Sequence, residues 1–172
     1  VTMSFIDKKT GNSLFTKYYG ETDTWFTFTE VNNAAVESDK VIFPLTKANS
    51  GASVHLFSFD LIDKNFQKIL VVPSPYTERN FIFMGDFLVT HDHYYILCGI
   101  QTQNTNEPLI IKIDKHSLEY QYIRWKDRTE GIVSYKMAYH NDGIIVFSTY
   151  PGVDFLTNGE LITFMDLEGK VI

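Results

Sequence analysis

The chain has 172 residues, of which 44% are hydrophobic, 15% aromatic and 21% charged, a composition typical of a folded globular protein. Its net charge of −6 and its lack of a basic cluster argue against a nucleic-acid partner, because that binding depends on Lys and Arg side chains that neutralise phosphates. Cys98 is the only cysteine, which excludes an internal disulfide, and the apolar segment YYILCGI around it predicts a buried side chain.

The predicted elements are short strands separated by polar turns, and no segment has a helical pattern. The strands are rich in β-branched and aromatic residues, whereas the segments between them carry Gly, Asn, Asp, Ser and Thr. In chain order, the predicted strands cover 3–6, 14–19, 25–31, 41–45, 56–59, 67–72, 81–89, 94–100, 110–113, 119–124, 132–139, 144–150 and 162–165.

An aspartate follows an apolar run four times at nearly constant spacing. Asp7, Asp60, Asp114 and Asp166 are separated by 53, 54 and 52 residues, although Asp63 could replace Asp60 in the second unit. An aspartate that enters a turn accepts hydrogen bonds from backbone N–H groups two or three residues further on, and so fixes the register of a hairpin. We therefore expect these four residues to have a structural role, the alternative being a ligand site repeated in each unit.

The turn residues support hairpins within each unit. Gly11 and Gly169 suit a left-handed backbone position in the turn after the repeated aspartate, and Asn65 is expected to take that role in the second unit. The dipeptides 142–143 (Asp-Gly) and 158–159 (Asn-Gly) predict type I′ turns, in which both central residues have positive φ.

A period of about 52 residues with four antiparallel strands per unit is typical of a β-propeller blade, whereas a sandwich would not require the hairpin to recur at this spacing. The sequence predicts an all-β fold, in which residues 1–172 form an arc of about three four-stranded blades. Because about three blades cannot close a ring, we expect the arc to belong to a larger propeller of roughly six to eight blades. The expected pieces are the end of one blade at 3–19, blades at 25–72 and 81–124, and an incomplete blade at 132–172.

Three segments carry a resemblance to a known family. HYYILCGIQTQN…PLIIKIDKHSLEYQYIR (93–124), SFIDKKTGNSLFTKYYGETDTW (4–25) and ITFMDLEGKVI (162–172) resemble extracellular β-propeller repeat proteins of the SBBP and quinoprotein-like kind. The resemblance implies a propeller in a secreted or cell-surface protein with a binding or scaffold role, and no catalytic residue. The tryptophan of the quinone-binding repeat is missing from the corresponding strand, so no cofactor is expected.

Candidate ligand-binding residues lie in the variable loops after the second strand of each unit, because loops on a rigid scaffold commonly carry recognition. The candidates are Asn49, Gly51, Asn104, Asn106 and Asp154.

His91 and His93 are the best candidates for metal ligands, since alternate residues of a strand share one face. A third ligand at a recognisable spacing is missing, so a solvated turn is the preferred interpretation and no metal site is predicted.

The leading expectation for function is a non-catalytic binding or scaffold module that recognises a protein or glycan. The remaining blades would come from the same chain or from another copy. One alternative is a propeller enzyme, a hydrolase or lyase acting on glycans, with most of its active site in other blades. Another alternative is a structural subunit of a filament or coat. No apolar run approaches the ~20 residues needed to span a membrane as a helix, so no membrane span is expected.

Overall fold

The computed structural model describes residues 2–20, 26–27, 34–47, 53–75, 81–101, 106–125, 133–151 and 158–172. Within these ranges every regular element is a β-strand and every strand pairing is antiparallel, which confirms the predicted all-β class. No helix in the described part of the chain is long and apolar enough to cross a membrane.

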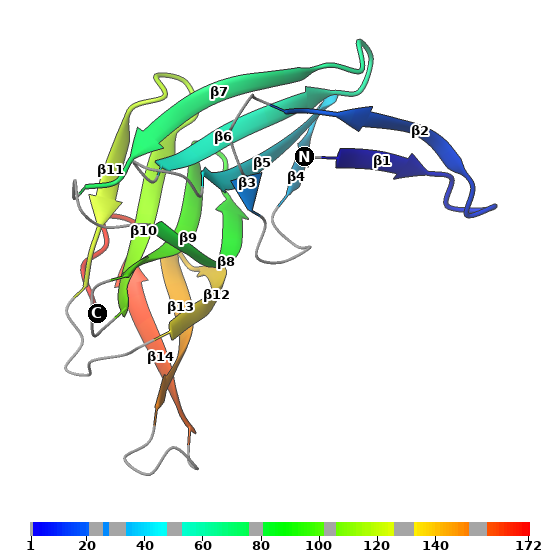
Figure 1. The fold of residues 1–172 in the computed structure, drawn as a ribbon. Helices are drawn as coiled ribbons and strands as arrows, with labels where there is room; N and C mark the ends of the chain where they lie inside the picture. Colours follow the sequence, from blue (N-terminus) through cyan, green and yellow to red (C-terminus); the bar gives the residue numbers. More distant parts are fainter. Residues whose placement is uncertain are drawn as a thin grey trace.

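The strands form four sheets that follow one another in chain order, from the blue hairpin to the orange and red sheet (Figure 1). The first sheet contains β1 (Thr2–Ile6) and β2 (Ser13–Tyr18). The second contains β3 (Phe26–Thr27), β4 (Ala35–Glu37), β5 (Lys40–Lys47), β6 (Ser53–Asp60) and β7 (Phe66–Pro73). The third contains β8 (Phe81–Val89), β9 (His93–Gln101), β10 (Asn106–Asp114) and β11 (Tyr120–Ile123). The fourth contains β12 (Val133–His140), β13 (Gly143–Pro151) and β14 (Asn158–Asp166).

The third sheet is a simple meander in which each strand pairs with the next along the chain. The second sheet differs at its first position, where one strand was predicted over 25–31. Two short strands, β3 and β4, instead pair with opposite ends of β5. The predicted polar turn between the first and second strands is present here as the tight connection between β4 and β5, with Ser38 at φ 51°.

Two expected glycine turns are wrong in detail. Both central residues of the turn between β12 and β13 have positive φ, 45° at Asn141 and 62° at Asp142, so the turn lies one residue earlier than 142–143. Gly143 already belongs to β13, where an added Cβ would lie 2.8 Å from the carbonyl oxygen of Met165. The predicted turn at 158–159 is instead the start of β14, which pairs with the end of β13.

Each interface between consecutive sheets contains its own apolar cluster. The cluster between the first two sheets is largely aromatic and includes Phe5, Phe15, Phe43, Phe57 and Phe59. The cluster between the second and third sheets includes Ile42, Val54, Leu56, Ile96, Cys98, Leu109 and Ile111. The cluster between the third and fourth sheets includes Tyr95, Leu97, Ile110, Met137, Ile144, Val146 and Met165.

The second and third sheets therefore bury both of their faces. In β9, neighbouring side chains point to opposite faces, so that Ile96 packs toward the second sheet and Leu97 toward the fourth. This arrangement explains why the central strands are continuous apolar runs instead of alternating patterns. Cys98 is fully buried, as its apolar neighbours predicted.

The third and fourth sheets come closest where β8 faces β12. Gly85 has φ 141°, and an added Cβ there would lie 2.6 Å from the carbonyl oxygen of Tyr135. The next residue, Asp86, is buried and accepts a 2.7 Å hydrogen bond from the backbone N–H of Met137. A bulge in β8 between Phe83 and Asp86 brings this carboxylate to the neighbouring sheet. The two sheets are therefore joined by a backbone contact as well as by apolar packing.

Candidate functional site

The four repeated aspartates all accept backbone hydrogen bonds in the turn that follows them. In the first three, Oδ1 accepts from the N–H groups two and three residues further on, at 2.7–2.9 Å. Asp166 accepts from the second and fourth following residues, at 3.0 and 2.8 Å. These backbone N–H groups lower the pKa of Asp7, Asp60 and Asp114, because they stabilise the ionised carboxylate.

The geometry distinguishes Asp60 from Asp63 in the second unit. Asp63 donates its backbone N–H to Asp60 and is therefore part of the turn that Asp60 organises. The left-handed residue of this turn is Lys64, with φ 54°, so the expectation for Asn65 is wrong by one position. Leu118 takes the same place in the third unit, with φ 60°. The position in the turn, and not the residue type, thus determines the backbone conformation.

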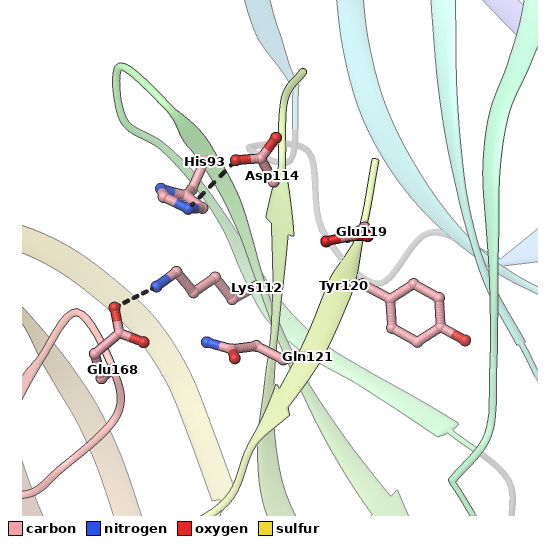
Figure 2. A pocket seen from close by; sticks show the side chains of 7 residues that line it. All are labelled: His93, Lys112, Asp114, Glu119, Tyr120, Gln121 and Glu168. Carbon is pink, nitrogen blue, oxygen red and sulfur yellow. Dashed lines mark hydrogen bonds and ion pairs between the residues drawn. The ribbon is translucent and has the colours of Figure 1, made fainter. Parts of the chain in front are cut away.

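Two clefts open beside these turns, each between two consecutive sheets. The 2–3 cleft has a volume of about 640 Å³. It is lined by Glu37, Ser38, Asp39, Lys40, Ile42, Ser58, Asp60, Ile62, Gln67, Ile69, Tyr94, Lys115, His116 and Leu118. The 3–4 cleft has a volume of about 220 Å³ and is lined by His93, Lys112, Asp114, Glu119, Tyr120, Gln121 and Glu168 (Figure 2).

The smaller 3–4 cleft is crossed by an ion pair. Lys112 is 7% exposed, and its Nζ lies 2.8 Å from Oε1 of Glu168 on the turn of the fourth sheet. This ammonium group lowers the pKa of Glu168. At the other end of the cleft, Nε2 of His93 lies 3.9 Å from Oδ2 of Asp114, and Tyr120 points away from both pairs (Figure 2). The protein's own charged side chains therefore pair with one another along the walls of this smaller cleft.

The larger 2–3 cleft is bounded by a partly buried polar cluster of three residues. The carboxylate of Glu37 accepts a 2.6 Å hydrogen bond from the hydroxyl of Tyr94 and another from Nζ of Lys115. That ammonium group also lies 4.9 Å from the centroid of the Tyr94 ring. Partial burial alone would raise the pKa of Glu37, but these hydrogen bonds lower it, whereas burial and the adjacent carboxylate raise the pKa of Tyr94.

The two clefts are equivalent places in the repeat. Gln67 and Gln121 each come seven residues after the aspartate of their unit, and each lines its own cleft. Two residues before the aspartate, the second sheet has Ser58 where the third sheet has Lys112. A serine is too short to reach across to the next sheet. The 2–3 cleft, at about 640 Å³, lacks this crossing side chain, whereas the 3–4 cleft that Lys112 crosses has about 220 Å³.

The two histidines considered as metal ligands do not converge, although His93 lines the 3–4 cleft. His91 is 94% exposed and its Nδ1 lies 2.6 Å from Oδ1 of Asp92, whereas His93 faces Asp114. The described residues contain no group of three or more His, Cys, Asp or Glu side chains arranged to hold a metal ion.

Of the five predicted binding residues, Asn106 alone lies in the described part of the chain. Asn106 begins β10, where it pairs with Gln101. Asn49, Gly51, Asn104 and Asp154 lie outside the described residues. The 2–3 cleft was not predicted from the sequence. The one signal for it is that the second unit has Ser58 two residues before its aspartate, where the third unit has Lys112.

Comparison with known proteins finds a distant structural likeness. No family model matches the chain, and no curated protein matches it. A crystal structure from Clostridium novyi NT, provisionally described as a conserved lipoprotein, is similar with a TM-score of 0.48 and 7% sequence identity. The alignment covers 78% of this chain and 86% of that one. A likeness this distant carries no statement about function.

Proposed function

We propose that this chain is a non-catalytic binding and scaffold module, formed by consecutive blades of a β-propeller that other residues complete. Four antiparallel sheets stacked in chain order, with an organised turn after the third strand of each unit, support the blade interpretation. The proposal includes an extracellular or cell-surface location, which rests on the sequence resemblance alone.

The observation that carries the proposal is the outer face of the fourth sheet. His93 pairs with Asp114 and Gly143 pairs with Asp166, so the two sheets can be aligned position by position. In this alignment, Ile162 corresponds to Ile110. Ile110 is completely buried against the fourth sheet, whereas Ile162 is 51% exposed. The neighbouring Phe164 is 50% exposed, and Ile145 and Phe147 are partly buried on the same face.

The fourth sheet thus presents toward solvent the same apolar face that the second and third sheets bury against their successors. An apolar patch of this kind marks an interaction surface. The partner that fits it is another β-sheet of the same kind, because that is what covers the equivalent face at both preceding interfaces. The covering sheet would belong to the same protein or to a second copy of this chain.

The proposal is tested by measuring the mass of the 172-residue chain in solution by light scattering over a range of concentrations. We expect concentration-dependent self-association that is removed by the paired substitutions Ile162→Lys and Phe164→Glu. Ile62→Lys, which alters an isoleucine in a turn that is 71% exposed, should leave the association unchanged. A well-folded wild-type chain that stays monomeric at every concentration would contradict the proposal.

A further inference from the structure

We infer that the 2–3 cleft is a binding site for a neutral, hydroxyl-rich ligand of the size of a mono- or disaccharide. This inference rests on the proposed binding function and names both the site and the ligand class. The volume of the 2–3 cleft, about 640 Å³, lies within the usual range for small-molecule sites. The described residues that line the cleft are different from the loop residues that the sequence indicated.

The charges of the cleft favour a neutral ligand. Glu37 and Lys115 neutralise each other through their ion pair. The other fixed charges are those of Asp39, Asp60 and Lys40, which leave a slight negative excess when histidine is neutral. A phosphate or another strong anion would meet these carboxylates without a compensating cluster of cations. A ligand that offers hydroxyl groups would add no charge to balance.

The polar groups of the cleft match hydroxyl groups, which both donate and accept hydrogen bonds. Ser58 is buried and lines the cleft, where its hydroxyl can donate and accept. Gln67 offers an amide, which also donates and accepts. Asp60 uses only Oδ1 for its turn, so Oδ2 can accept from a ligand. Ile69 and Leu118 supply apolar surface for the C–H face of a sugar ring.

The walls of the cleft are held in place before any ligand arrives. Glu37 belongs to the second sheet, while Tyr94 and Lys115 belong to the third, so their hydrogen bonds fix the two sheets relative to each other. A preformed site loses less conformational entropy on binding than one that must be ordered. The equivalent 3–4 cleft, which is smaller and is crossed by the ion pair of Lys112 and Glu168, serves as an internal comparison that is not expected to bind.

The experiment is a titration of the isotopically labelled chain with glucose, maltose and N,N′-diacetylchitobiose, followed by protein NMR. Glucose 6-phosphate serves as the anionic comparison. We expect at least one neutral sugar to shift the amide signals around Ser58 and Gln67, and expect glucose 6-phosphate to bind more weakly than glucose. Gln67→Ala should weaken binding by about tenfold, the effect of one lost hydrogen bond of about 1.4 kcal/mol. The matched variant Gln121→Ala, in the equivalent position of the 3–4 cleft, should bind like the wild type.

A second variant tests whether the open space is what matters. Ser58→Lys places in the 2–3 cleft the residue that crosses the 3–4 cleft, and it should abolish binding. Near-ultraviolet circular dichroism would establish that this variant remains folded, and Ser58→Thr gives a smaller change if it does not. Absence of shifts with all three neutral sugars would overturn the inference, as would equal weakening by Gln67→Ala and Gln121→Ala. Self-association through the fourth sheet is measured separately, so the failure of one proposal would not be mistaken for that of the other.

Discussion

Ser58 and Lys112 occupy the same position in consecutive sheets, two residues before the repeated aspartate, and the difference between them sets how far each cleft opens. Lys112 crosses to Glu168 of the next sheet at 2.8 Å. Ser58 reaches no partner there, and the next sheet is instead held by Tyr94 and Lys115, which both donate to Glu37. The repeat thus keeps its sheets in place with different polar contacts at each interface.

The contact between Glu37 and Lys115 should contribute measurably to stability. We expect Glu37→Gln to lower the free energy of unfolding at neutral pH by about 1–3 kcal/mol, because it weakens charge-assisted hydrogen bonds at a partly buried site. Urea unfolding of Glu37→Gln, Lys115→Met and the double variant gives the coupling energy between the two side chains. Strictly additive effects of the two substitutions would show that the pair makes no net contribution.

Three of the repeated aspartates should make the fold sensitive to acid. The folded-state pKa values of Asp7, Asp60 and Asp114 are lowered by backbone N–H groups, so their contribution to stability is present above the unfolded pKa of about 4 and is lost as the pH falls through the folded value. Asp114→Asn should therefore lower the free energy of unfolding at pH 7. It should also make that free energy fall less steeply as the pH is lowered below 5, which denaturant unfolding at several pH values would measure.

The control for this substitution is Asp63→Asn, in the turn that follows Asp60 in the second unit. Asp63 is exposed and contributes its backbone N–H, but not its carboxylate, to the hydrogen bonds of the turn. Its substitution should leave the pH dependence unchanged. If Asp63→Asn and Asp114→Asn changed the loss of stability at low pH equally, that loss would come from the net charge and not from the hydrogen bonds of the turn.

Gly85 should tolerate no side chain. Gly85→Ala places a Cβ 2.6 Å from the carbonyl oxygen of Tyr135 at φ 141°, so we expect a loss of roughly 1–3 kcal/mol, the cost of a strained backbone position. Gly20→Ala is the control, because no atom lies within 4 Å of its added Cβ. Thermal unfolding compares the two, and a midpoint for Gly85→Ala equal to that of Gly20→Ala would refute the close approach of β8 and β12.

The thiol of Cys98 should react only when the chain unfolds. The side chain is completely buried, and desolvation raises its pKa well above the ordinary value, so the nucleophilic thiolate is scarce in the native state. We expect an aromatic disulfide reagent to modify no thiol in the native protein and one thiol per chain in denaturant. Rapid modification under native conditions would indicate that the interface between the second and third sheets opens readily.

How much could be predicted from the sequence depends on the distance along the chain over which each contact forms. The turn of Asp114 requires only its next three residues, so the spacing of such turns indicated the units and their strands. The contact between Glu37 and Lys115 joins residues 78 positions apart and depends on how two sheets face each other. No periodicity in the sequence specifies which side chains meet across such an interface.

The glycine turns show a second limit. Lys64 and Leu118 adopt positive φ without being Gly or Asn, because the flanking hydrogen-bonded strands determine the backbone at that position. The dipeptide at 158–159 has the local preference of a turn. In the structure, Asn158 and Gly159 instead belong to β14 and pair with the end of β13. Local propensity is overridden in both cases by strand pairing that extends beyond the turn itself.

The stacking of the sheets also bears on how such a chain can vary in length. Each described apolar cluster joins two consecutive sheets, so a complete unit inserted between two others would need to satisfy only one new interface on either side. Duplication of a whole unit would therefore leave the remaining interfaces as they are, whereas loss of half a unit would expose an apolar face. The architecture permits growth in steps of one repeat, while each interface is free to diverge in its polar contacts.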